Sequence, residues 1–297
     1  MVSILRKLFK TNFSINQYKS EGQPFQHTDK DIRENIKRIT DSKKYHSAEY
    51  EKLLAPYLES HENITYAEYV RLKDTGDRKF LLIRHDVDHD NRTAIKMGEW
   101  EAERGLRSTY CLLHTAWYYG PLVNGRYHHS KELIECATKL HELGHEINFH
   151  NNLVVTFLKE GVDPVELLES ELEFFRDKLG IPVTGTSTHG DKLCREYNFR
   201  NWELFKECCD ERFGGPREIK HRIKNGERVV GLGKYSMFDF GLEYEGYDVM
   251  RDIYHTDSGG NQRTRQNARG RRPFGRKDIT KSEIVGVLTH PIWWDFN

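Results

Sequence analysis

The chain has 297 residues, and its 46 lysines and arginines balance 46 aspartates and glutamates, so the formal net charge is zero. A balanced chain has no long-range field that would attract nucleic acid, and no stretch approaches the ~20 consecutive apolar residues of a membrane-spanning helix. We therefore expect no nucleic-acid partner and no stable membrane insertion. A hydrophobic fraction of 37% allows a sizeable core, in one large domain or two ordinary ones.

The N-terminal residues and the cysteines favour a cytoplasmic location. Residues 1–13 are basic and partly apolar, but lysines interrupt them and no cleavage site of small residues follows, so we expect no secretory signal. A short amphipathic surface contact is the alternative for this segment. The five cysteines are an odd number without a C-x-x-C pair, which favours reduced structural thiols.

Residues 1–78 are polar and rich in lysine and tyrosine, with weak helical periodicity at 31–39 and 47–58. We interpret them as a helical N-terminal extension and not as a catalytic unit. The pattern then changes, because residues 80–83 are a continuous apolar run, as in a strand that is buried on both faces. We therefore divide the chain into this extension and a second domain at 79–297.

Strands and helices alternate along the second region. Strands are predicted at 80–83, 108–113, 146–149, 182–186, 229–232 and 284–288, and helices at 92–104, 130–143, 163–179 and 198–209. The segment Asp-Pro-Val-Glu at 163–166 combines an N-cap, a proline at the first helical position and a capping-box glutamate. Strands separated by helices of this length predict βαβ units and a parallel sheet. The first strand is followed by no G-x-G-x-x-G motif, and there is no P-loop, so the sequence does not support a nucleotide-binding, doubly wound sheet.

Acidic residues and histidines stand where the predicted strands end. The residues at five strand ends are Asp86 with Asp88, His114, His150, His189 and His290. Ligands and catalytic groups of parallel α/β sheets and barrels lie at the carboxyl ends of strands, so we expect these side chains to share one centre. His145 opens its strand and should lie at the opposite end, so we interpret it as structural.

The segment Asp86-Val87-Asp88 offers two carboxylates to one site. In an extended backbone both would point to the same side, while Val87 would turn into the core. One carboxylate could bind a divalent metal, and the other could accept a proton from water that the metal activates. Imidazole and carboxylate ligands suit Zn²⁺, with Mn²⁺, Co²⁺ and Ni²⁺ as alternatives. The other interpretation is a solvated acidic turn that caps the next helix, which suits Asp90.

His290 ends an apolar strand, in Val-Leu-Thr-His-Pro at 287–291. An imidazole with a pKa of about 6.5 suits a general acid that protonates a leaving amine. The alternative is a histidine at the end of a strand that is hydrogen-bonded to the backbone.

Three of these segments form an ordered set: His-Asp-Val-Asp at 85–88, Gly-His-Glu-Ile-Asn-Phe-His at 144–150 and Leu-Thr-His at 288–290. Together they resemble the NodB-type polysaccharide deacetylases, carbohydrate esterase family 4 and its relatives, over roughly residues 79–294. The resemblance implies a distorted (β/α)7-type barrel. It implies that Asp86 is the catalytic base and that His290 is the catalytic acid. Asp88 and His150 would be metal ligands.

This sequence departs from the family at two points. The second metal-binding histidine of the family's His-x-x-x-His would fall at Val154, which cannot bind metal. The family's Arg/Pro-rich third motif is replaced by Thr-Ser-Thr-His-Gly-Asp at 186–191. Our hypothesis is that His189 supplies the missing ligand, with His114 as the next candidate and Asn152 as the third.

The whole pattern is closer to a divergent branch of deacetylase-like proteins than to the chitin or peptidoglycan deacetylases. Sequences like Tyr-His-Thr-Asp-Ser-Gly-Gly at 254–260 recur in that branch, so Asp257 is a candidate substrate-binding or supporting residue; the alternative is an aspartate in a turn. His114 is also a candidate substrate contact. Trp293 and Trp294 could stack on a sugar ring, or they could close the core.

The resemblance implies a metal-dependent hydrolase that removes an N-acetyl or other acyl group from an amino sugar, so a carbohydrate is the expected substrate. A cytoplasmic location favours a nucleotide- or lipid-linked sugar of surface-polysaccharide synthesis over a cell-wall polymer. Val154 motivates an alternative, a degenerate and inactive barrel that binds carbohydrate. The Arg-rich segment at 252–277 is expected to be a solvated loop; its alternative role is a clamp for an anionic ligand.

Overall fold

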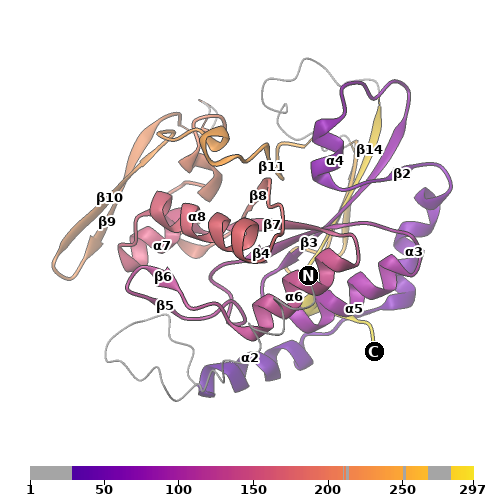
Figure 1. The fold of residues 1–297 in the computed structure, drawn as a ribbon, viewed down its shortest axis with the longest axis horizontal. Coiled ribbons are helices and arrows are strands. Elements are labelled where there is room, and N and C mark those ends of the chain that lie inside the picture. Colours follow the sequence, from indigo (N-terminus) through magenta and orange to yellow (C-terminus); the bar gives the residue numbers. More distant parts are fainter. Residues whose placement is uncertain (1–28, 210, 212–213, 250–251, 267–281) are drawn as a thin grey trace.

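The computed structural model describes residues 29–209, 211, 214–249, 252–266 and 282–297. They form an α/β fold in which helices pack around one curled, mostly parallel sheet (Figure 1). No helix among these residues is long and apolar enough to pass through a membrane. All five cysteines are buried, and none of them forms a disulfide in the described structure. The expectations for residues 1–13 and for the arginines at 269–276 concern positions outside the described residues and stay predictions.

The main sheet has nine described strands. Their order is β11 (Tyr244–Glu245), β8 (Gly185–Thr188), β7 (Glu146–Asn151), β4 (Thr109–Leu113), β3 (Lys79–Val87), β14 (Glu283–Thr289), β12 (Ile253–Thr256) and β13 (Arg263–Gln266), and β2 (Glu62–Asn63) pairs with β3 off this path. Every neighbouring pair is parallel except β12 with β13. The predicted α/β class and parallel sheet are confirmed. The described strands form a curled half-barrel with β11 and β13 at its edges, and they do not show a complete (β/α)7 barrel.

Helices follow the strands of the sheet along the chain. They are α5 (Asn91–Ala102), α6 (Lys131–Glu142), α7 (Leu153–Glu160), α8 (Pro164–Glu173) with a π-helical continuation (Phe174–Lys178), and α9 (Lys192–Glu196). Asp90 and Asp163 cap α5 and α8, since each carboxylate accepts hydrogen bonds from the first amides of its helix. α5 and α6 pack closely because residue 98 is a glycine; a Cβ there would lie 2.4 Å from the Leu140 side chain.

The helix predicted at 198–209 is wrong. Only Asn201–Leu204 form a short 3₁₀ turn in this segment. The Asn201 side chain accepts a hydrogen bond from the Val155 amide and donates one to the His189 carbonyl. Asparagine competes in this way with helix formation, because its side chain bonds the backbone in other conformations.

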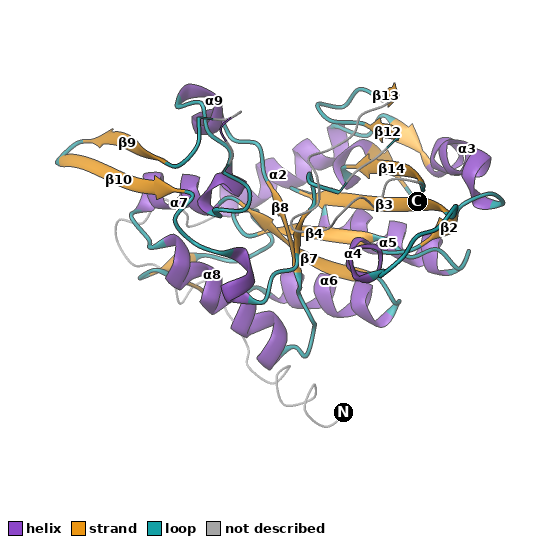
Figure 2. Ribbon diagram, turned by 90° about the horizontal axis from the view of Figure 1, so that it is seen from above, coloured by secondary structure: helices purple, strands orange, loops and turns teal. Residues whose placement is uncertain are grey.

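The strand predicted at 229–232 exists, but it lies outside the main sheet. It is part of β10 (Gly226–Leu232), which pairs antiparallel with β9 (Arg217–Ile223). Only two residues link the strands, and β10 begins at a glycine with a φ of +135°. So short a link makes a hairpin, whereas parallel strands would need a helical crossover. The hairpin projects from one end of the molecule in both views (Figures 1 and 2).

The described part of the N-terminal extension is helical, as predicted, and packs against the sheet. Its helices are α2 (Asp29–Asp41), α3 (Ser47–Leu58) and α4 (Tyr66–Arg71). Between α2 and α3, β1 (Tyr45–His46) pairs in parallel with β15 (Trp294–Asp295) near the end of the sequence. Tyr50 and Leu54 of α3 share one buried apolar cluster with Leu81 of β3, Val287 of β14 and Trp294.

Candidate metal centre

Three strand ends bring a carboxylate and two imidazoles together. Asp88 directly follows β3, and His189 directly follows β8. His150 is the last residue but one of β7. Oδ1 of Asp88 lies 3.2 Å from Nε2 of His150 and 3.3 Å from Nδ1 of His189. One ligand atom from each residue lies within 4.8 Å of the other two. These three residues are therefore a candidate metal-binding triad, and the proposed third ligand His189 is in place.

The hydrogen bonds around the triad fit a bound cation. Oδ1 of Asp88 is buried and accepts no hydrogen bond. Nδ1 of His150 lies 2.8 Å from the Ser187 carbonyl oxygen; it must donate there, which leaves the lone pair on Nε2 facing Asp88. A carbonyl that fixes the tautomer in this way is typical of metal-binding histidines. Two imidazole nitrogens and one carboxylate oxygen are a donor set that suits Zn²⁺.

Protons compete with a cation for this triad. Burial raises the pKa of Asp88, but His189 and His150 beside it outweigh burial and hold that pKa well below its usual value. Burial lowers the pKa of His189, and the Asp88 carboxylate raises it overall. Asp88 is therefore ionised at neutral pH, and the His189 nitrogen carries a proton at acid pH that a metal must displace.

Asp86 lies beside the triad and is fixed by an arginine that we did not single out from the sequence. Its Oδ2 lies 3.7 Å from Nε2 of His150. Arg84, two residues earlier on β3, donates from Nε to Oδ1 and from Nη2 to Oδ2, both at 2.7 Å. Burial raises the pKa of Asp86, but the facing Arg84 lowers it overall. Strand alternation puts residues 84 and 86 of β3 on one side, so this signal was present in the sequence.

His290 follows β14 and completes the group. Its Nε2 lies 4.0 Å from Oδ2 of Asp86 and 3.9 Å from Oδ2 of Asp88. Its Nδ1 lies 2.6 Å from Oδ1 of Asp257, and its backbone N–H donates to Oδ2 of the same carboxylate. Burial lowers the pKa of His290, but the hydrogen bond and the charge of Asp257 raise it to about 9. His290 is therefore protonated at neutral pH in the absence of a metal.

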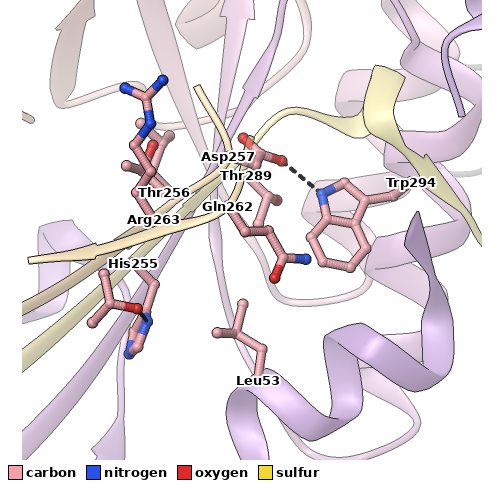
Figure 3. Close-up of a pocket in the computed structure, with 10 residues that line it drawn as sticks. Leu53, His255, Thr256, Asp257, Gln262, Arg263, Thr289 and Trp294 are labelled. Atoms are coloured by element: carbon pink, nitrogen blue, oxygen red, sulfur yellow. Dashed lines mark hydrogen bonds between the residues drawn. The ribbon is translucent and has the colours of Figure 1, made fainter. Parts of the chain in front are cut away.

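Asp257 is hydrogen-bonded to His290, which fits the supporting role, and its contact with a substrate stays a prediction. Its carboxylate is buried, and Oδ2 also accepts the Trp294 indole N–H at 2.7 Å (Figure 3). Asp257 and Trp294 line a pocket of about 220 Å³, together with Leu53 of α3 and Arg263 of β13. The Asp257 side chain thus connects the His290 imidazole to Trp294 in the core.

Two of the predicted substrate contacts are buried side chains. His114 is fully buried, with Nδ1 3.2 Å from the Tyr127 hydroxyl and Nε2 accepting the Asn152 amide at 3.0 Å. It is not part of the triad, and its contact with a substrate stays a prediction. Trp294 is also fully buried in an apolar cluster, which favours the core alternative, and its indole lines the pocket beside Asp257. Trp293 is half-buried, and its contact with a sugar stays a prediction.

The remaining candidates have structural places. The Asn152 side chain bonds Asn201 and Thr115 and is not part of the triad. Val154 is buried in the core on α7. His145 lies at the opposite end of its strand, as predicted, where Nε2 contacts the Gly98 carbonyl at 2.9 Å and Nδ1 accepts the Ser108 amide.

Comparisons with known proteins add no relative to this description. No family model matches the chain. No curated protein and no solved structure matches it either. The resemblance to polysaccharide deacetylases therefore rests on the three motifs alone and stays a prediction.

Proposed function

We propose that this chain is a metal-dependent hydrolase that cleaves the amide of an N-acylated amino sugar. The observation that carries the proposal is that three kinds of group lie close together at the carboxyl ends of the strands. A triad able to hold a cation lies there, with a separate ionised carboxylate, Asp86, and a protonated imidazole, His290, within about 4 Å of it. Binding, proton acceptance and proton donation are the tasks that amide hydrolysis requires.

Each residue has one task in this reaction. Asp88, His150 and His189 would hold the cation, which when bound supplies Lewis acidity that polarises a carbonyl and lowers the pKa of water from 15.7 to about 7. Asp86, held by Arg84, accepts a proton from the water whose oxygen attacks the carbonyl carbon. His290 gives its proton to the nitrogen as the carbon–nitrogen bond breaks. The products are a carboxylic acid and a free amine.

The substrate and the fold are narrower proposals. Three motifs support membership of a divergent branch of the NodB-type deacetylases, with the curled half-barrel as the described part of a distorted (β/α)7 barrel. The acyl group would be acetyl, and the substrate a cytoplasmic glycan intermediate such as a nucleotide- or lipid-linked amino sugar. Zn²⁺ is the proposed cofactor, with Mn²⁺, Co²⁺ and Ni²⁺ as alternatives.

Metal analysis and acetate release from a panel of N-acetylated amino sugars test this function. Purified protein should carry one metal ion per chain and release acetate. Asp88→Asn should lose both the metal and turnover, whereas Asp86→Asn should keep the metal and lose turnover. Normal hydrolysis by both variants would contradict the assignment.

A second candidate is a binding protein without catalysis. Two exposed arginines on the edge strand β13, Arg263 and Arg265, favour an anionic ligand. This function predicts binding that weakens steeply as the salt concentration rises and that survives Asp88→Asn. Stoichiometric metal together with turnover would exclude it as the main function.

A further inference from the structure

Lys43, between α2 and β1 in the N-terminal extension, contacts three acceptors at the edge of the site. Its Nζ lies 2.5 Å from Oδ2 of Asp90, 2.8 Å from Oγ1 of Thr93 and 3.1 Å from the carbonyl oxygen of Pro291. An ammonium group has three N–H donors. Each of them therefore has an acceptor here.

These acceptors belong to two different loops that carry the proposed chemistry. Asp90 stands two residues after Asp88, in the loop that follows β3. Pro291 directly follows His290, in the loop that follows β14. β3 and β14 are neighbours in the sheet, but hydrogen bonds of the sheet end before these loops begin. Lys43 joins the two loops beyond that point.

The residues after Lys43 attach the same segment to a third loop. The Lys44 backbone N–H donates to the Trp293 carbonyl at 2.8 Å. The Lys44 ammonium and the Tyr45 hydroxyl both donate to the Gly260 carbonyl, at 2.9 and 3.2 Å. The Gly260 amide in turn donates to the Asp257 carbonyl at 2.7 Å. One short segment of the extension thus contacts the loops of Asp88, His290 and Asp257.

The Lys43 contact is more than a surface ion pair. Its side chain is 20% exposed, and that of Asp90 is 3% exposed. Exposed pairs contribute little because water and salt screen them, whereas pairs that are largely buried are screened much less. Asp90 also caps α5, so the contact acts on a rigid helix end and not on a free side chain.

We propose that Lys43 is a positioning residue that holds the loop of Asp88 and the loop of His290 at a fixed separation, so that the N-terminal extension completes the active site. Oδ2 of Asp88 and Nε2 of His290 lie 3.9 Å apart. A displacement of about 1 Å between reacting groups can cost about a hundredfold in rate. The catalytic part of this inference rests on the proposed hydrolase function.

Three variants separate positioning from general stability. Lys43→Met removes all three donors and keeps the length of the side chain, Lys43→Arg keeps the charge, and Lys52→Met is a matched control on the exposed side of α3. Lys43→Met should lower kcat by about tenfold or more, with KM within about twofold and the metal content unchanged. Lys43→Arg should restore part of kcat. Equal kcat values for Lys43→Met and Lys52→Met would overturn the proposal.

Two tryptophan indoles report on the loops without any assay of activity. The Trp117 indole donates to the His89 carbonyl at 2.6 Å, in the Asp88 loop, and the Trp294 indole donates to Asp257. In Lys43→Met, both indole protons should exchange with solvent about tenfold faster than in wild type, because loss of a tether favours local opening. Lys52→Met should leave them unchanged.

A second variant guards against poor folding of Lys43→Met. Asp90→Asn keeps the helix cap, because asparagine caps as well as aspartate, but it loses the ion pair; it should change exchange in the same direction. Unchanged exchange in both variants would overturn the tether. If wild-type protein hydrolysed no N-acylated sugar, the proposed function would fail, and indole exchange would then decide the tether by itself.

Discussion

Two buried clusters in this protein each place one carboxylate beside two imidazoles, and they differ in how their polar atoms are satisfied. In the Glu101 cluster, Oε1 accepts hydrogen bonds from the Tyr50 hydroxyl at 2.5 Å and from Nε2 of His85 at 2.9 Å. Oε2 accepts one from the Tyr110 hydroxyl at 2.7 Å, and His145 lies 3.9 Å from it. Both oxygens therefore have donors from the protein itself.

The Asp88 cluster, formed by Asp88, His150 and His189, has the opposite character. Oδ1 of Asp88 is buried without a donor, and the nearest nitrogen of each histidine faces it at 3.2 and 3.3 Å. An unsatisfied buried carboxylate oxygen is costly unless a cation or a donor reaches it. The two clusters have the same types of side-chain group. What distinguishes the structural cluster from the candidate metal site is whether the protein provides hydrogen-bond donors to the carboxylate.

The largest expected effects come from neutralising the carboxylate of each cluster. Glu101→Gln should lower the free energy of unfolding by about 3–5 kcal/mol, because it breaks a buried charged network, and should leave the metal content of the folded protein unchanged. Asp88→Asn should abolish stoichiometric metal and keep the free energy of unfolding of the metal-free protein within about 1 kcal/mol of wild type. Denaturant unfolding and metal analysis of both variants measure this. Metal loss in Glu101→Gln would mean that the two clusters do not differ as described.

The next largest effect concerns His290, the proposed general acid. His290→Gln should lower kcat by about 10²- to 10⁴-fold, the range of general acid–base catalysis, while the metal content stays the same. His221→Gln is a matched control, because His221 lies on the β9–β10 hairpin, where its Nδ1 contacts the Tyr197 hydroxyl. Steady-state kinetics with metal-loaded protein give the comparison. A loss of less than tenfold would remove His290 from the reaction.

Much of the site could be predicted, because strand alternation and strand ends are local properties of a sequence. The convergence of Asp88, His150 and His189 follows from three parallel strands that end at one edge of the sheet. Whether a side chain at a strand end is buried is not a local property of the sequence, however, because it depends on distant segments. His114 follows β4 as His189 follows β8, yet its ring stacks on Phe149 inside the core.

The parts of the fold that escaped prediction depend on pairing between distant segments. The strands β12 and β13 are only four residues long each, and they show no apolar periodicity. The pairing of β1 with β15 joins residues about 250 positions apart in the sequence, Tyr45 with Trp294 and His46 with Asp295, which no local pattern can indicate. The role of Arg84 is different, because its position two residues before Asp86 on the same strand is a local property that the sequence contains.

A smaller effect is expected at Asp86, the proposed general base. Arg84→Lys keeps a positive charge but loses the two-pronged contact with Asp86, so the carboxylate should be less well fixed and its pKa should rise. We expect kcat to fall by about tenfold, and the acid side of the pH profile of kcat/KM to move to higher pH. The metal content should stay at the wild-type level. An unchanged profile would show that Arg84 does not control Asp86.

The smallest effects are opposite pH dependences of stability in the metal-free protein. Burial raises the pKa of Glu101, but His85 and the other contacts lower it overall from 4.5 to about 2. Its contribution is therefore present above about pH 4.5 and is lost as the pH falls through about 2. The pKa of His290 is raised from 6.5 to about 9, since Asp257 outweighs burial. Its contribution is present below about pH 6.5 and is lost as the pH rises through about 9.

Denaturant unfolding across this pH range, on metal-free wild type and two variants, separates the contributions. Glu101→Gln should flatten the acid side of the stability profile and leave the alkaline side alone. Asp257→Asn should flatten the alkaline side, because it removes the partner that raises the pKa of His290. Metal should weaken the alkaline dependence in wild type, because a cation beside the imidazolium repels it and lowers its pKa. An alkaline side that is the same in Asp257→Asn as in wild type would place its origin in another group.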